Sequence, residues 1–211
     1  MSVILNDPAI IHAERPAPVL GSTISGEVTV RADDGATYRR SVCAIIMDQR
    51  GCFLGCRRSD DRKVLQWVQG GAKVHETVQQ TAEREVFEEI GLPASYLHLI
   101  GEVLPAVACN EPRAPFRYKS KSWRKLGIVG QELYPLLYIV DTSVVELLRF
   151  RAVQGERREF CGAKWVDLNE LIKYCSPSKR EVVTNICRAV VPLARGVMGA
   201  DSAPELGEVM V

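Results

Sequence analysis

Residues 70–92 read Gly-Gly-Ala-Lys-Val-His-Glu-Thr-Val-Gln-Gln-Thr-Ala-Glu-Arg-Glu-Val-Phe-Glu-Glu-Ile-Gly-Leu. Residues of a helix advance by about 100° each, so Glu85, Glu88 and Glu89, at i, i+3 and i+4, would project from one face. Like charges at this spacing repel unless a cation lies among them. Carboxylate oxygens are hard ligands that suit Mg²⁺ or Mn²⁺. The spacing therefore predicts a divalent-metal site on a helix over residues 77–90.

The same stretch carries a longer pattern of fixed positions. In order, they are Gly70, Glu76, Arg84, Glu85, the apolar Val86, Glu88, Glu89, Gly91 and the apolar Leu92. This pattern matches the Nudix box at every fixed position, so the chain resembles a Nudix hydrolase. The resemblance implies an α/β fold of the Nudix type, an α/β/α sandwich with a mixed sheet and the loop-helix-loop of the box.

The resemblance also implies a hydrolase that acts on phosphorus-containing acid anhydrides. Its substrates carry a nucleoside diphosphate linked to another group, and water replaces one phosphoanhydride oxygen. The implied cofactor is Mg²⁺, with Mn²⁺ as the alternative, held by Glu85, Glu88 and Glu89 to neutralise phosphate charge and lower the pKa of a bound water. Arg84 would hold one carboxylate bidentately, and Glu76 fits the same supporting role.

Glycines mark both ends of the box. Gly70 and Gly71 follow a predicted strand, where the backbone can approach a phosphate or the metal closely, although a simple turn would also explain them. Gly91 is typical of a helix C-terminus. Without the full motif, the three glutamates would be read as a solvated helix face; the motif favours the metal site.

Composition predicts one globular domain. The chain has 211 residues, of which 46% are hydrophobic and 25% charged, values that are ordinary for a protein with a sufficient core. We expect an N-terminal extension over residues 1–36, a Nudix domain over 37–195, and a disordered tail over 196–211. The net charge of +1 selects no partner by itself.

Signals for membranes or export are absent from the sequence pattern. No run approaches the roughly 18 apolar residues of a membrane span, and residues 1–36 hold five acids against two arginines, which is atypical of a signal or transit peptide. The seven cysteines form no CxxC pair, as expected for reduced thiols. These features predict an intracellular, cytoplasmic protein with no membrane partner, and they leave organelle targeting and the oligomeric state open.

Hydrophobic periodicity predicts interleaved strands and helices. Expected strands cover residues 27–31, 42–47, 52–56, 66–69, 97–104, 133–141 and 163–166. Expected helices cover residues 77–90, 168–174 and 179–194, the last with apolar positions Val182, Val183, Ile186 and Val190. Because the two types do not alternate strictly, a mixed sheet between helices is predicted.

Short motifs outside the box narrow the resemblance. They are Tyr38-Arg39-Arg40-Ser41-Val42, Gln66-Trp67-Val68-Gln69, Gly130-Gln131, Glu159-Phe160, Trp165-Val166 and Lys179-Arg180. In this order, over about residues 38–190, they resemble the branch that contains asymmetric diadenosine tetraphosphate hydrolases and the bacterial RNA pyrophosphohydrolase.

This branch implies further site residues. Glu159 stands where a carboxylate outside the box completes the metal site or takes a proton from the attacking water; the alternative is an exposed glutamate paired to Arg157 and Arg158. The candidate substrate contacts are Arg39, Gly70, Gly71, Tyr118, Lys119, Gln131 and Lys179. Arg39 and Lys179 could equally be surface residues that make no contact with the phosphates. Tyr118 could equally be a packing residue instead of stacking on a base.

Residues 113–125 form a basic segment. It holds six basic residues, no acids, and the aromatic Phe116, Tyr118 and Trp123. Such interleaving suits a polyphosphate with a stacked base, or single-stranded RNA. The alternative is a mobile, solvated loop.

Three functions remain open. The first is cleavage of a dinucleoside polyphosphate such as diadenosine tetraphosphate. The second is removal of phosphates from an RNA 5′ end that carries a triphosphate or a cap. The third is a nonhydrolytic RNA-binding or regulatory protein on a Nudix scaffold, whose usual sign is loss of box carboxylates; none is lost here.

Overall fold

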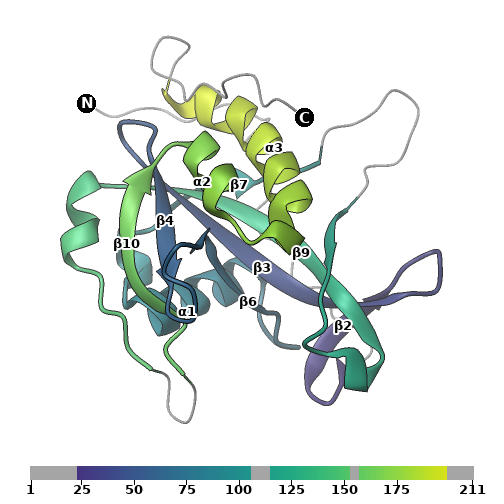
Figure 1. The fold of residues 1–211 in the computed structure, drawn as a ribbon. Helices are drawn as coiled ribbons and strands as arrows, with labels where there is room; N and C mark the ends of the chain where they lie inside the picture. The colour runs from purple at the N-terminus through teal and green to yellow at the C-terminus, as the bar shows by residue number, and fades with distance from the viewer. Residues whose placement is uncertain (1–22, 106–114, 153–156, 199–211) are drawn as a thin grey trace.

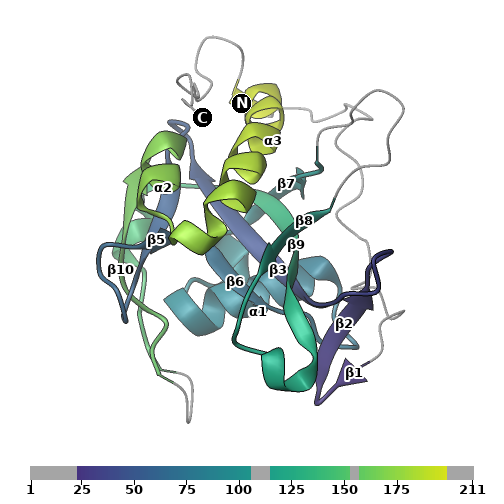
Figure 2. The ribbon, with the colours of Figure 1, turned by 45° about the vertical axis from the view of Figure 1, so that its right-hand side comes forward.

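Three layers make up the fold. The computed structural model describes residues 23–105, 115–152 and 157–198 (Figure 1). Within these ranges a mixed sheet of ten strands separates helix α1 (Val78–Ile90) from helices α2 (Leu168–Tyr174) and α3 (Arg180–Met198), as Figures 1 and 2 show. The predicted α/β/α architecture is confirmed.

Two long parallel strands form the centre of the sheet. They are β3 (Thr37–Asp48) and β9 (Ile128–Val140). Along β3, Cys43 and Ile45 pack in the core beneath α2 and α3, whereas Ala44 packs in the core beneath α1. Helices cover both faces, so apolar residues occupy successive positions of the strand instead of alternating with polar ones.

Shorter strands pair with this central pair. They are β1 (Thr23–Ile24), β2 (Glu27–Arg31), β4 (Phe53–Arg58), β5 (Leu65–Gln66), β6 (Val68–Gly71), β7 (His98–Glu102), β8 (Phe116–Lys119) and β10 (Phe160–Val166). Strands β2, β4 and β6 run antiparallel to β3, and β7 and β8 run antiparallel to β9. This pairing brings the end of β6 and the starts of β3 and β9 together.

Helix α1 is fixed at both ends by local sequence. Thr77 forms a capping box in which its hydroxyl accepts a hydrogen bond from the backbone N–H of Gln80 and the Gln80 side chain accepts one from the backbone N–H of Thr77. At the other end Gly91 adopts a left-handed φ of 71°, the conformation that glycine tolerates best. The buried face packs on the sheet through Val78, Thr81, Ala82, Val86 and Ile90. The glutamates of the box therefore face the end of β6.

The opposite face of the sheet is covered by α2 and α3. Asp167 caps α2 by accepting a hydrogen bond from the Glu170 backbone N–H at 2.7 Å. In α3 the four predicted apolar positions, Val182, Val183, Ile186 and Val190, are all buried. A 3-10 turn, Pro177–Lys179, precedes α3 and brings Lys179 toward the sheet.

Several predicted boundaries needed correction. The single strand predicted over 66–69 is two strands, β5 and β6, interrupted at Trp67. A solvated loop is the wrong alternative for the described part of residues 113–125, which includes β8, where the inward Phe116 and Tyr118 alternate with Arg117 and Lys119. Helix α3 continues to Met198, beyond the predicted start of the tail at residue 196. The rest of that tail lies outside the described residues.

Two further expectations concern membrane-spanning helices and the cysteine thiols. In the ranges that the structure describes, no helix is long and apolar enough to cross a membrane. Six of the seven cysteines fall in those ranges and are free thiols, four of them buried. Cys109 lies outside them.

Candidate active site

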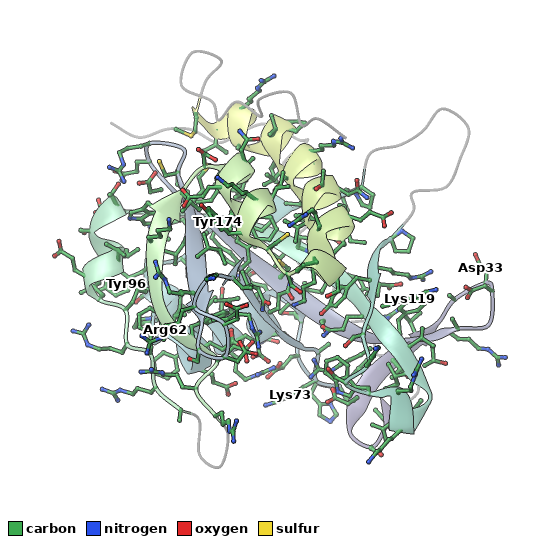
Figure 3. The ribbon with its side chains drawn as sticks, viewed as in Figure 1. Asp33, Arg62, Lys73, Tyr96, Lys119 and Tyr174 are labelled. Atoms are coloured by element: carbon green, nitrogen blue, oxygen red, sulfur yellow. The ribbon has the colours of Figure 1, made fainter. Side chains whose placement is uncertain are left out.

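One open cleft of about 1590 Å³ contains every predicted site residue. They are Arg39, Gly70, Gly71, Arg84, Glu85, Glu88, Glu89, Tyr118, Lys119, Gln131, Glu159 and Lys179. Figure 3 labels two exposed cations of this cleft, Lys73 after β6 and Lys119 on β8. The carboxylates of α1 lie in a cleft that also contains cations from several other elements.

Arg84 connects the acidic residues of the box. Its Nε and Nη2 donate to the two carboxylate oxygens of Glu76 at 2.8 and 3.0 Å. Its Nη1 donates to one oxygen of Glu85 at 2.7 Å and to one oxygen of Glu88 at 3.0 Å, and Nη2 also donates to the Gly71 carbonyl at 3.1 Å. Burial opposes ionisation of Glu76, but hydrogen bonds from Arg84 and Thr81 outweigh it and lower the pKa of this carboxyl.

Gly70 leaves space for the Glu85 carboxylate. A Cβ at Gly70 would lie 1.7 Å from the Glu85 carboxyl carbon, so no other residue fits without moving Glu85. Burial raises the pKa of Glu85, and Arg84 opposes this effect. The need for glycine here is thus steric; the role of Gly70 as a metal ligand stays a prediction.

Glu89 has a buried carboxylate oxygen that no hydrogen bond from the described part of the chain satisfies. Its Oε2 is buried and has no hydrogen-bond partner among the described residues. Burial, followed by the charges of Glu85 and Glu159, raises the pKa of Glu89 to about 9. The carboxylate has a backbone hydrogen bond at Gln69, but a buried charged oxygen without a partner is costly, so this group requires either a proton or a cation.

The box carboxylates suit a hard divalent cation. In the described part of the chain, no three acidic, His or Cys side chains are already arranged around a metal position. Arg84 contacts Glu85 and Glu88 through only one oxygen of each, and Glu89 has its unpartnered oxygen. The donor set consists of oxygens, which Mg²⁺ and Mn²⁺ prefer.

Glu159 pairs with Arg58, a residue that the sequence analysis did not select. Nη1 of Arg58 donates to Glu159, and its Nε and Nη2 donate to the two Asp60 oxygens, each at 2.7 Å. Arg157 and Arg158, the expected alternative partners, form no ion pair with Glu159 in the described ranges. Arg58 ends β4, which pairs with β10 beside Glu159; its cationic charge at a strand end was the signal available in the sequence.

Lys179 is a partly buried cation at the same cleft. Its Nζ donates to the side-chain oxygens of Gln66 at 2.9 Å and Gln69 at 2.8 Å, and it lies 5.0 Å from the centroid of the Tyr118 ring. Burial, followed by the charge of Arg58, lowers the pKa of Lys179 to about 8. Tyr118 is only 8% exposed and packs against this amine.

The pKa of Lys179 leads to a testable pH dependence. Lys179 loses its charge as the pH rises through about 8, whereas an arginine stays charged. For an anionic substrate, kcat/KM of Lys179→Arg divided by kcat/KM of the wild type should therefore increase as the pH is raised beyond about 8. Initial rates from pH 6.5 to 9.5 at constant ionic strength measure it. Lys73→Arg, at an exposed lysine of the same cleft, is the control; a flat Lys179→Arg ratio would contradict the assignment.

Arg39 and Gln131 come from the paired starts of β3 and β9. They lie opposite each other in the parallel register, and Tyr118 of β8 lies opposite Gln131. Arg39 contacts Glu27, which the sequence did not point to, and Trp123, which the sequence indicated only as an aromatic residue of the basic segment 113–125. The pairing of β2 with β3 brings Glu27 to Arg39, and the return of the chain from β8 to β9 brings Trp123 there.

Comparisons with known proteins agree with this geometry. The family model described as NUDIX domain matches residues 37–186. An RNA pyrophosphohydrolase of Marinomonas sp. (strain MWYL1) is 30% identical over 164 residues, which are 76% of this chain and 95% of that protein. Another, from Edwardsiella ictaluri (strain 93-146), is 27% identical over 82% of this chain and 94% of the relative.

A solved structure has the same fold. The M. smegmatis Nudix hydrolase RenU superposes with a TM-score of 0.50 at 14% identity, covering 78% of this chain and 96% of RenU. The family match spans most of the described domain and includes the whole carboxylate motif. The chain therefore belongs to the NUDIX domain family and is a hydrolase that acts on phosphoanhydride bonds.

Proposed function

We propose that this protein is a Mg²⁺-dependent pyrophosphohydrolase that removes phosphate from a 5′-triphosphorylated RNA end. The observation that carries the proposal is the combination, in one cleft, of the Glu89 carboxylate, whose buried Oε2 has no partner among the described residues, with exposed cations. The names of the curated relatives support the RNA end over the dinucleoside polyphosphate that the sequence alone placed first.

Each group of side chains has a distinct part in this proposal. Glu85, Glu88 and Glu89 would hold Mg²⁺, which when bound supplies charge neutralisation on the phosphates and a more acidic water. Arg84 keeps Glu85 and Glu88 in place through its hydrogen bonds. Glu159, whose side chain is 36% exposed, would accept the proton of the attacking water.

The basic segment supplies contacts for a nucleic acid chain. Lys119, Lys121 and Arg124 are exposed, line the cleft, and form no salt bridge in the described ranges. Arg117 differs, because it pairs with Glu132 at 2.6 Å and stacks over Tyr38. Lys119, Lys121 and Arg124 are therefore available to RNA phosphates, whose contacts with lysine and arginine dominate such binding.

A dinucleoside polyphosphate is the second candidate. Besides the carboxylates, the cleft is lined by Arg58, Lys179, Arg39 and Lys119. A polyphosphate with a nucleoside at each end could use several of these cations, and the Trp123 ring next to Arg39 offers an aromatic surface. The hydrolytic chemistry would be the same.

A pair of double variants tests the RNA proposal. Lys119→Ala/Lys121→Ala should lower kcat/KM for a triphosphorylated oligonucleotide, and the slope of log kcat/KM against log salt should become shallower by about 0.7 for each lost phosphate contact. The matched control is Arg62→Ala/Lys63→Ala, at two exposed cations outside the cleft; Figure 3 labels Arg62. Hydrolysis should be followed by chromatography of the products.

The same assay ranks the two substrate classes. The wild type should prefer the triphosphorylated oligonucleotide over diadenosine tetraphosphate in kcat/KM, and the Lys119→Ala/Lys121→Ala variant should lose most of that preference. A wild-type preference for the free dinucleotide, unchanged in the variant, would replace the RNA proposal with the second candidate.

A further inference from the structure

The β1–β2 hairpin lies outside the family match but lines the cleft. The match begins at residue 37, whereas β1 and β2 cover Thr23–Ile24 and Glu27–Arg31. Ser25, Gly26 and Glu27 nevertheless line the same cleft as the box carboxylates. Figures 1 and 2 both show this hairpin beside the turn that joins β8 to β9. This segment therefore adds side chains that the family domain alone does not provide.

Arg39 is held between these two elements. Its Nε donates to Glu27 Oε2 at 2.5 Å, and its guanidinium carbon lies 4.8 Å from the centroid of the Trp123 ring. Nη1 contacts the Ser41 hydroxyl at 3.5 Å. A Cβ at Gly71 would lie 2.1 Å from Nη2. A carboxylate, an indole ring and the bare Cα of Gly71 thus fix one guanidinium from three directions.

The position of Arg39 relies on the adjacent glycines. Gly70 leaves room for the Glu85 carboxylate, and Gly71 leaves room for the Arg39 guanidinium. Both side chains line the cleft, and Arg39 is near enough to favour the charged form of Glu85. The acceptors in the described residues use two of the five N–H groups of Arg39. The others can serve a phosphate oxygen next to the carboxylates.

We propose that Glu27 and Trp123 are positioning residues that hold Arg39 ready for a phosphate of the substrate, which makes the segment before residue 37 part of the active site. The inference rests on the proposed function in one respect, the contact between Arg39 and phosphate. A long arginine side chain loses rotamer freedom when it binds, and fixing it beforehand strengthens binding by removing part of that cost.

Glu27 has two physical effects that oppose each other. Its hydrogen bond orients the guanidinium, while its negative charge repels an incoming phosphate. Glu27→Gln retains an acceptor for Nε and removes the charge, whereas Glu27→Ala removes both. If positioning dominates, Glu27→Ala binds phosphate more weakly than the wild type and Glu27→Gln does not. If charge repulsion dominates, both variants bind more tightly than the wild type.

The test measures binding of imidodiphosphate, a pyrophosphate analogue with a P–N–P link, by calorimetry in the presence of Mg²⁺. We expect Glu27→Ala to raise Kd roughly five- to tenfold and Glu27→Gln to stay within about twofold of the wild type. Asp33→Asn is the matched control, because it removes one acidic charge from the same segment at an exposed position outside the cleft (Figure 3). Circular dichroism verifies that each variant is folded.

A double-variant cycle shows whether Glu27 acts through Arg39. Arg39→Met should raise Kd for imidodiphosphate, and adding Glu27→Ala should cause no further change. Trp123→Leu should weaken binding, and Trp123→Phe, which keeps an aromatic face for the guanidinium, should recover part of the loss. An equal loss in both Trp123 variants would contradict the stacking role.

The proposal is overturned if Glu27→Ala binds imidodiphosphate as tightly as the wild type, or if its effect persists in the Arg39→Met background. Failure of the proposed function would look different. In that case the wild type would not cleave triphosphorylated RNA, while the Kd for imidodiphosphate would still rise in Glu27→Ala and Arg39→Met.

Discussion

Glu89→Gln is expected to lower kcat by at least roughly 100-fold, because it removes a proposed oxygen ligand of the metal, and even supporting residues of metal sites contribute 10- to 100-fold. The same change should raise the melting temperature of the metal-free protein. Glu89 Oε2 is buried without a partner in the described residues, and a neutral amide is less costly there. Melting in EDTA and steady-state rates in Mg²⁺ measure the two effects.

The gain in stability of metal-free Glu89→Gln over the wild type should increase with pH. The pKa of Glu89 is raised from 4.5 to about 9, so the folded metal-free protein binds a proton that the unfolded chain releases. Its stability therefore falls as the pH rises from about 4.5 to 9. The advantage of Glu89→Gln should grow over this interval, by roughly 2–4 °C for each kcal/mol.

Glu83→Gln is the matched control for this pair of effects. Glu83 lies on the same helix, accepts a hydrogen bond from Gln79 at 2.7 Å, and is outside the cleft. It should leave kcat within about twofold of the wild type, as expected for a substitution away from the chemistry. Near-normal Mg²⁺-dependent turnover in Glu89→Gln would contradict the assignment of Glu89.

Gly70→Ala should lower activity nearly as much as Glu89→Gln, because it displaces Glu85. The added methyl would lie 1.7 Å from the Glu85 carboxyl carbon, so Glu85 must move away from its position beside β6. A displacement of about 1 Å at a catalytic group can reduce rate by about 100-fold. We expect kcat/KM to fall to that extent, with a higher Mg²⁺ concentration needed for half-maximal rate. Titration of the rate with Mg²⁺ measures both.

Gly162→Ala provides the comparison for this variant. Nothing lies within 4 Å of a Cβ at Gly162, so the same substitution in β10 should be nearly neutral. If Gly70→Ala retained wild-type activity and Mg²⁺ dependence, the steric role of Gly70 would be wrong. If it failed to fold, Glu85→Gln, which keeps the side-chain volume, would test the same carboxylate.

The site was predictable where one helix determines it. The spacing of Glu85, Glu88 and Glu89 places them on one face without any knowledge of the sheet, and Arg84 lies on the same two turns. The capping residues fix where that helix begins and ends. The buried face of α1 follows from the same local pattern.

Other parts of the site depend on long-range pairing. Arg58 and Glu159 are 101 residues apart, and only the register of β4 with β10 brings them together. Glu27 reaches Arg39 through the pairing of β2 with β3. Within neither pair does a local spacing in the sequence relate the two residues. Strand β8 was missed because its cations concealed the inward alternation of Phe116 and Tyr118.

The central claim is that the box carboxylates carry out Mg²⁺-dependent hydrolysis of a phosphoanhydride bond. Its most direct test is mass spectrometry of the products formed from a triphosphorylated oligonucleotide in ¹⁸O-enriched water, with Mg²⁺ or EDTA, for the wild type and Glu89→Gln. We expect one ¹⁸O atom in a product phosphate per turnover, dependent on Mg²⁺ and nearly absent in the variant. Equal incorporation in EDTA or in Glu89→Gln, or none with either this substrate or diadenosine tetraphosphate, would contradict it.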